Sequence, residues 1–202
     1  MKRGKLVALE GLDGSGKSTQ LARLGDALQA KGVGVCLTRE PTDGPHGRRI
    51  RTLAQSPTRV PPEQELQLFL EDREQHVREC VAPALADGCL VLTDRYFLST
   101  VAYQGARGLD WRGLLADSEA RFPIPDLVVC LELPPEVGLA RVRARGGVAE
   151  PAFEREGFLT RVAEIFSAID RPYLHRIDAN RPESVVQADL WARVEALRAT
   201  AT

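Results

Sequence analysis

A glycine-rich segment near the N-terminus has the residue types that bind phosphate groups. Residues 11–18 match the pattern G-x-x-x-x-G-K-[ST]. Glycines let backbone N–H groups turn inward around a polyphosphate, and a helix starting after them adds positive potential. Lys17 can reach the β and γ phosphates, and the Ser18 hydroxyl can ligate Mg²⁺. The segment therefore predicts an ATP-type site made of Gly11, Leu12, Asp13, Gly14, Ser15, Gly16, Lys17, Ser18 and Thr19.

Other nucleotide-binding classes fit this loop poorly. A GTPase reads guanine with N-K-x-D, but Asn180 is the only asparagine in the chain and Arg181 follows it. The dinucleotide-binding pattern G-x-G-x-x-G is absent from the loop. A chain of 202 residues is also short for an ATP-driven motor or transporter subunit. The remaining class is a kinase that phosphorylates a small molecule.

Two charged clusters follow predicted strands and could hold the acceptor. Asp94 and Arg95 come directly after an apolar run, where a carboxylate can hold Mg²⁺ and a guanidinium can clamp phosphate oxygens. Residues 38–41, Thr-Arg-Glu-Pro, end another predicted strand and include Glu40, and Arg51 follows further on. Surface ion pairs and a polar loop are the alternatives, but parallel strands would bring both clusters to the crevice that holds the phosphate loop.

Two more groups complete a possible two-substrate site. Phe69 and Arg73 are four residues apart, so they share one face of a predicted helix. A flat base bearing a carbonyl suits this pair, because arginine only donates, and thymine or uracil is favoured over cytosine. Arg141, Arg143 and Arg145 could close over the transferring phosphoryl group, and a solvated helix end is the equal alternative.

The elements that must position these residues alternate along the chain. Strands are expected at residues 5–10, 33–38, 89–93 and 127–131, and 176–178 could form a short fifth. Helices are expected at 17–31, 63–86, 111–121, 136–145, 158–170 and 183–198. Apolar strands separated by helices indicate an α/β fold with a parallel sheet covered on both faces. We expect one domain over residues 1–202, with a mobile lid at about 141–156.

Composition supports a globular protein. Hydrophobic residues make up 44% and charged residues 27%, and the net charge of −1 gives no general attraction to nucleic acid. No apolar run approaches the ~20 residues of a membrane span, and the first residues do not resemble a signal peptide, so a cytoplasmic location is expected. The four cysteines form no C-x-x-C pair and are expected to be buried, reduced thiols.

Together these segments resemble the thymidylate kinase family of P-loop kinases. Residues 94–105, DRYFLSTVAYQG, are similar to the family pattern D-R-Y-x-x-S-x-x-A-Y-Q-G, and TREP at 38–41 and F-x-x-x-R at 69–73 also fit. The resemblance implies a P-loop NTPase fold, a five-stranded parallel sheet with helices on both faces, and a homodimer. It implies transfer of a phosphoryl group from ATP with Mg²⁺ to dTMP, which gives dTDP and ADP.

The same resemblance implies roles for individual residues. Phe69 would stack on thymine, Arg73 would bond its O4, and Tyr103 would crowd the position of a ribose 2′-OH. Residues 178–180 would flank the adenine. The metal would lie at Ser18 and Asp94. In the implied acceptor site, Asp13 contacts the 3′-OH, and Arg51 and Arg95 hold the phosphate. The other members of that site are Glu40, Phe69, Arg73, Thr100, Tyr103 and Gln104.

The phosphate loop lacks an arginine, so the chain resembles the family class whose lid supplies this charge. The implied catalytic residues are Lys17, Arg95, Arg141, Arg143 and Arg145. Two positions depart from the pattern: Ala152 replaces a common lid arginine, and Thr42-Asp43 replaces a glycine pair.

The implied reaction is in-line and needs no strong base, because the second pKa of the attacking phosphate is about 6. Another deoxynucleotide or deoxynucleoside kinase is one alternative. A nucleotide-binding regulator without catalysis is the other.

Overall fold

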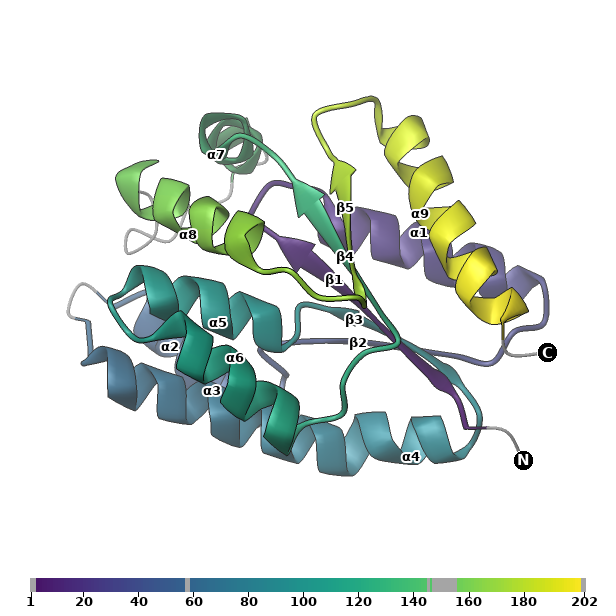
Figure 1. Cartoon of the computed structure of the whole chain (residues 1–202), viewed down its shortest axis with the longest axis horizontal. Helices are drawn as coiled ribbons and strands as arrows, with labels where there is room; N and C mark the ends of the chain where they lie inside the picture. The colour runs from purple at the N-terminus through teal and green to yellow at the C-terminus, as the bar shows by residue number, and fades with distance from the viewer. Residues whose placement is uncertain (1–2, 57–58, 145, 147–155, 201–202) are drawn as a thin grey trace.

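Five parallel strands form one sheet in the computed structural model, which describes residues 3–56, 59–144, 146 and 156–200 (Figure 1). The strand order is β2-β3-β1-β4-β5, and every neighbouring pair is parallel. The strands are β1 (Lys5–Gly11), β2 (Val35–Arg39), β3 (Leu90–Asp94), β4 (Leu127–Glu132) and β5 (Leu174–Asp178). The predicted five-stranded parallel sheet is therefore confirmed.

Helices cover both faces of this sheet and make three layers (Figure 1). α1 (Lys17–Ala30) and α9 (Glu183–Ala199) lie on one face. The other face carries α5 (Phe97–Ala106) and α8 (Glu156–Ala168). The remaining described helices are α2 (Pro45–Ala54), α3 (Pro62–His76), the π-helical η1 (Val77–Val81), α4 (Ala82–Ala86), α6 (Trp111–Arg121) and α7 (Pro135–Ala144). None of the helices in the described ranges has the length and apolar character needed to cross a bilayer.

Alternation along β1 supplies both cores. Val7 and Leu9 pack with α1 and α9, whereas Leu6 and Ala8 pack with the helices of the opposite face. All four side chains are fully buried, as expected for a strand whose successive side chains point to opposite faces of a doubly covered sheet.

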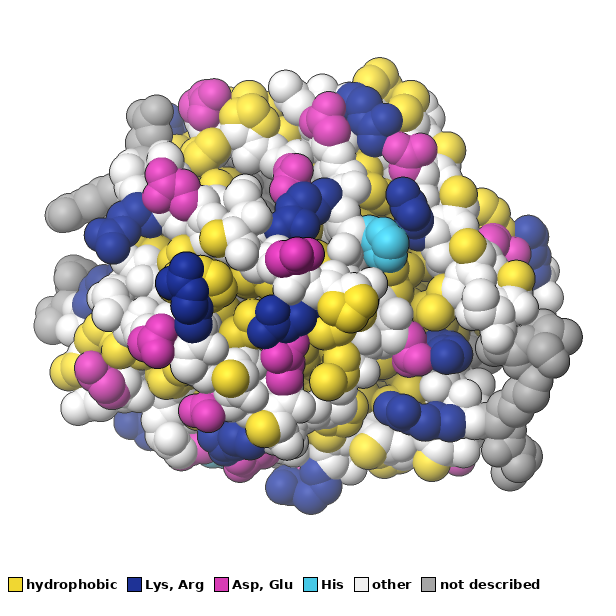
Figure 2. All heavy atoms as spheres, in the orientation of Figure 1, with side chains coloured by type: hydrophobic (Ala, Val, Ile, Leu, Met, Phe, Trp, Pro, Cys, Tyr) yellow, Lys and Arg dark blue, Asp and Glu magenta, His cyan; other side chains and the backbone are white. Residues whose placement is uncertain are grey.

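On the surface, basic and acidic side chains are interspersed over the face that Figure 2 shows.

Two helices were not predicted from the sequence. All ten residues of α5 are buried, so no polar stripe marks a helical period. α2 is a short segment with few apolar residues, of which Ile50 and Ala54 are buried. The expected helix at 63–86 is one continuous helical run in which α3 passes through the π-helical η1 into α4. The fifth strand is longer than expected and begins at Leu174.

A buried carboxylate joins the sheet to the N-terminus of α5. Glu10 is fully buried at the end of β1, and its Oε1 accepts hydrogen bonds from the backbone N–H groups of Tyr96 (2.9 Å) and Ser99 (3.2 Å). The Ser99 hydroxyl donates to Oε2. The first N–H groups of a helix have no partner within it, so Glu10 supplies one from another element. Burial raises the pKa of Glu10 to about 7, against the lowering effects of Ser99 and Arg95.

This shift predicts a pH-dependent stability that Glu10→Gln removes. Between about pH 4.5 and pH 7 the folded protein keeps a proton on Glu10 that the unfolded chain releases, so the free energy of unfolding falls as pH rises. The contribution of this group is on the order of 3 kcal/mol. Urea unfolding across this range should show the fall in wild type and a flatter profile in Glu10→Gln.

The matched control is Glu132→Gln, near the end of the neighbouring β4. It should keep the wild-type slope. An unchanged slope in Glu10→Gln would show that the pKa of Glu10 is ordinary in the folded protein.

Candidate active site

The ends of three neighbouring strands bring the predicted residues to one edge of the sheet. In the parallel register, Leu9 of β1 lies opposite Asp94 of β3, and Arg39 of β2 lies opposite the same residue. The phosphate loop follows β1, the segment from Asp94 to Tyr96 follows β3, and Glu40 follows β2. This edge is the carboxyl end of the strands, where open α/β sheets bind ligands.

Glycine is required at two points of the phosphate loop. Gly11 has φ +131° and Gly14 has φ +81°, which are backbone conformations that other residues rarely adopt. A Cβ at Gly11 would lie 2.4 Å from the Leu131 carbonyl oxygen, and one at Gly14 would lie 2.3 Å from that of Gly138. The loop is therefore packed against β4 and α7. α1 begins at Lys17, and no side chain caps its N-terminus, which leaves its N–H groups for an anion.

Lys17 is buried inside the loop that it follows. Its Nζ donates to the carbonyl oxygens of Leu12 (2.8 Å) and Gly11 (3.1 Å) and lies 3.5 Å from the Ser15 hydroxyl. Burial, aided by the charge of Arg95, lowers the pKa of Lys17 to about 8. The ammonium is thus held beside the turn where a polyphosphate would be bound.

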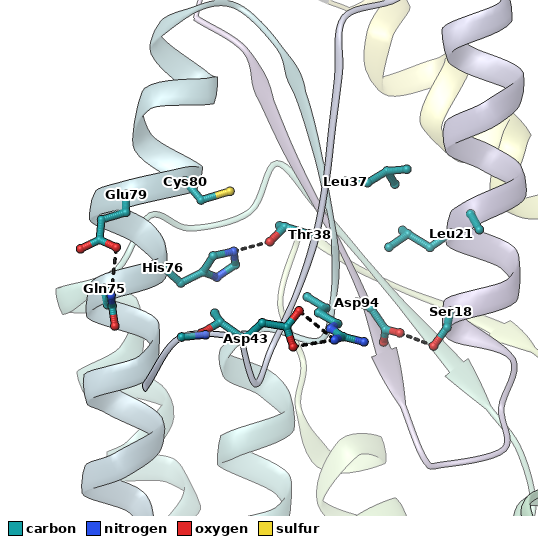
Figure 3. Close-up of a pocket in the computed structure, with 14 residues that line it drawn as sticks. Ser18, Leu21, Leu37, Thr38, Asp43, Gln75, His76, Glu79, Cys80 and Asp94 are labelled. Atoms are coloured by element: carbon teal, nitrogen blue, oxygen red, sulfur yellow. Dashed lines mark hydrogen bonds and ion pairs between the residues drawn. The ribbon is translucent and has the colours of Figure 1, made fainter. Parts of the chain in front are cut away.

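The Ser18 hydroxyl and the Asp94 carboxylate lie together beside the phosphate loop. The Ser18 hydroxyl donates to Asp94 Oδ2, and Figure 3 shows the two side chains pointing toward each other. Asp94 Oδ1 is buried and has no hydrogen-bond partner among the described residues. Mg²⁺ prefers oxygen ligands and is usually held by one or two protein groups together with substrate phosphates. The donor set and the unpaired oxygen therefore fit this ion.

Arg95 links the phosphate loop to the segment after β3. Its φ of +69° is the left-handed conformation, uncommon outside glycine. Nη2 donates to Asp13 Oδ1 (2.6 Å) and Nη1 to the Ser99 hydroxyl (2.9 Å), and the guanidinium lies 5.3 Å from the centre of the Tyr103 ring. Burial opposes ionisation of Asp13, but Arg95 and Lys17 hold the pKa of its carboxyl below the usual value.

A cavity of about 270 Å³ adjoins Arg95 and collects most of the predicted acceptor residues. α2, α3 and α5 provide walls, and the segment after β2 provides another. Eight of the nine predicted residues line it: Asp13, Glu40, Arg51, Phe69, Arg95, Thr100, Tyr103 and Gln104. The sequence did not single out Glu65, Ser99 and Ile50, which also line it.

Arg73 is the predicted acceptor residue that does not line this cavity. It is 1% exposed, and its Nε and Nη2 donate to Glu40 Oε2 at 2.9 and 2.6 Å. Nη2 also donates to Thr100 Oγ1 at 2.9 Å, whereas Nη1 has no hydrogen-bond partner among the described residues. Burial opposes ionisation of Glu40, but Arg73 and His76 hold the pKa of its carboxyl below the usual value.

His76 is a buried member of this network that sequence reasoning missed. Its Nδ1 lies 2.9 Å from Glu40 Oε1, and its Nε2 lies 2.7 Å from Thr38 Oγ1. Because the Glu40 carboxylate only accepts, Nδ1 donates to it. The spacing of three residues after Arg73 on α3 was the one available signal. His76 also lines a larger cavity of about 560 Å³, together with Thr38, Cys80 and Asp94 (Figure 3).

A third cavity lies on the other side of the phosphate loop. It measures about 470 Å³, and Gly14, Gly16 and Thr19 line it together with Ala179. Arg141 on α7 also lines this cavity, and its Nη1 donates to the Ala179 carbonyl oxygen at 3.2 Å. The predicted adenine-flanking stretch is therefore next to the loop, with Arg141 beside it.

The rest of the expected lid is only partly placed. Arg143 is exposed on α7. Arg145 and residues 147–155, which include Ala152, lie outside the described residues.

Known proteins are similar in sequence to this chain over most of its length. The sequence model of the thymidylate kinase family matches residues 9–190. A thymidylate kinase of Desulfotalea psychrophila is 41% identical over 194 residues, 96% of each chain. One from Xanthomonas euvesicatoria is 48% identical over 177 residues, which cover 88% of this chain and 77% of the relative. One from Akkermansia muciniphila is 43% identical over 187 residues, with coverages of 93% and 89%. Since the match covers the phosphate loop, the cavity beside Arg95 and the sheet that joins them, this chain belongs to the thymidylate kinase family.

Proposed function

We propose that this chain is a kinase that transfers the γ-phosphoryl group of ATP to dTMP and forms dTDP and ADP. The observation that carries the proposal is the contact between two binding sites: Arg95 lines the acceptor cavity and also bonds Asp13 in the phosphate loop. Membership of the thymidylate kinase family supports ATP and dTMP as the two nucleotides. A donor phosphate in the loop and an acceptor phosphate in the cavity would then meet at Arg95.

The acceptor nucleotide is proposed to enter with its base toward α3 and its phosphate toward the loop. Phe69 would stack on the thymine, and Tyr103 would exclude a ribose 2′-OH. Arg51 donates to Asp43 Oδ1 (3.0 Å) and lines the cavity, so its guanidinium is positioned to hold the acceptor phosphate with Arg95. Asp13 would receive the sugar 3′-OH.

Charge compensation, rather than proton removal, is the proposed source of catalysis. The attacking phosphate oxygen is already mostly anionic at neutral pH, because its second pKa is about 6. Lys17 and Arg95 would stabilise charge on the transferring group, with Arg141, Arg143 and Arg145 added from the lid at about 141–156. Mg²⁺ held by Ser18 and Asp94 would neutralise phosphate charge.

The family resemblance also supports a homodimer. We propose that residues 1–202 form a single kinase domain, and that the protein works in the cytoplasm.

A panel of acceptors tests the function directly. ADP formation from ATP should be efficient with dTMP and much weaker with dCMP and AMP, because the proposed base site favours a carbonyl over an amine at C4 of the pyrimidine and a deoxyribose over a ribose. Including dUMP measures the contribution of the thymine methyl group. A preference for AMP would contradict the base site, and ATP binding without transfer to any monophosphate would support a regulator.

Replacing the loop lysine separates binding from catalysis. Lys17→Ala should lower kcat by about 100-fold or more, while the Kd for ATP changes far less, because the charge on the transferring phosphoryl group develops in the transition state. Steady-state kinetics and ATP titration provide the two values. Lys31→Ala, at the other end of the same helix, is the matched control. Near-normal turnover in Lys17→Ala would refute the assignment.

The metal proposal makes a separate prediction for Asp94. Asp94→Asn keeps an acceptor for the Ser18 hydroxyl but removes the charge, so the half-saturating Mg²⁺ concentration should rise by about tenfold or more. Asp87 is exposed and precedes the N-terminal end of β3, so Asp87→Asn should leave the half-saturating Mg²⁺ concentration unchanged. An unaltered Mg²⁺ titration in Asp94→Asn would place the ion elsewhere.

A further inference from the structure

Gln104 presents a fixed amide to the acceptor cavity. It lies on α5, lines the cavity and is 1% exposed. Its Nε2 donates to Glu65 Oε2 at 2.6 Å, whereas its Oε1 is buried and has no hydrogen-bond partner among the described residues. Buried acceptors without a donor are uncommon in folded proteins, so this oxygen calls for a partner that the described protein residues do not supply.

Glu65 is in turn held in place by arginine side chains. It is 6% exposed on α3, and Arg107 Nη1 donates to the same Oε2 that receives the Gln104 amide. Arg107 Nη2 also donates to the Val60 carbonyl oxygen at 2.6 Å, and Arg59 Nη2 lies 3.4 Å from Glu65 Oε1. The Glu65 carboxylate therefore cannot turn away from Gln104 without breaking an ion pair.

This arrangement determines which end of the amide faces the cavity. A carboxylate only accepts hydrogen bonds, whereas the two ends of a glutamine amide are an acceptor and a donor. The reversed amide would set Oε1 against Glu65 Oε2, acceptor against acceptor. The NH₂ end must therefore face Glu65, and the carbonyl end is left for a ligand.

Thr100, one turn earlier on the same helix, presents the opposite polarity. Its Oγ1 accepts from Arg73 Nη2 at 2.9 Å, so its own proton is free to donate to a ligand in the cavity that it lines. A base edge that offers an N–H donor beside a carbonyl acceptor matches this pair. Thymine and uracil have that order at N3 and O4, whereas cytosine has an acceptor at N3 and an amine at C4.

We propose that Glu65, fixed by Arg107, is a positioning residue that selects the base by orienting the Gln104 carbonyl toward the N3–H of a thymine or uracil ring. The inference rests on the proposed function, since it takes the cavity to hold the acceptor base. Glu65 acts on the base through Gln104 and does not need to touch it.

Glu65→Gln tests the proposal because the new side chain is almost isosteric but can donate as well as accept. The ion pair with Arg107 is then lost, so the side chain at position 65 no longer holds the Gln104 amide in one orientation. The ratio of kcat/KM for dTMP to kcat/KM for dCMP should fall by about tenfold or more. The KM for dTMP should rise while its kcat stays close to wild type. Glu63→Gln removes the same charge from an exposed position on the same helix and should leave the ratio unchanged.

A double-variant cycle shows whether Glu65 acts through Gln104. Gln104→Met removes the oriented acceptor and should also reduce the dTMP preference. Adding Glu65→Gln to that variant should then change the ratio no further. A second fall of similar size would overturn the relay. A loss of efficiency that is equal for dTMP and dCMP would reduce Glu65 to a structural contact between α3 and α5.

Two further outcomes keep the proposals separate. If Glu65→Gln fails to fold, Glu65→Asp keeps the charge beside Arg107 but shortens the reach to Gln104, and the same fall in ratio is expected. If wild type does not phosphorylate dTMP, the proposed function fails. If wild type prefers dTMP strongly over dCMP and every Glu65 variant keeps that preference, only the positioning role fails.

Discussion

Parallel pairing of β1 with β3 determines where both nucleotides would be bound. Because Leu9 lies opposite Asp94, the phosphate loop and the segment that carries Arg95 leave the sheet side by side. Arg95 can therefore reach Asp13 from its left-handed backbone conformation, and Ser18 can reach Asp94. A shift of this pairing by one residue would turn each side chain to the opposite face of the sheet and separate these groups.

The cations of the site have protein acceptors as partners. Lys17 donates to loop carbonyl groups, Arg95 to Asp13 and Ser99, and Arg73 to Glu40. Burying such charges is costly unless they are paired, and a buried pair is weak evidence for a large gain in stability. The geometric consequence is clearer: protein groups hold each cation in a fixed position. Preorganised charge needs little rearrangement as the transition state forms.

Sequence reasoning succeeded where the chemistry is local. The phosphate loop is one continuous motif, and β1, β3 and β4 are apolar runs. The positions of the loop and of these strands were therefore predicted within a few residues. α5 was missed because it is buried on all sides and has no amphipathic period. Glu10 and Glu65 carry no local signal, and His76 has only its spacing from Arg73, since each of the three bonds a residue at least 30 positions away. The roles implied for the individual site residues stay predictions.

The position of Arg73 limits how it can recognise a base. The family resemblance implies a bond from Arg73 to the thymine O4, yet two of its nitrogen atoms are engaged by Glu40 and Thr100 and it does not line the cavity. Its buried Nη1 is the group left to make such a bond. Arg73 donates to Thr100, and Glu65, on the same helix, accepts from Gln104. Two charged residues of α3 thus fix the polarity of two neutral side chains of α5, and neutral donors and acceptors can face a base without the desolvation cost of a charge.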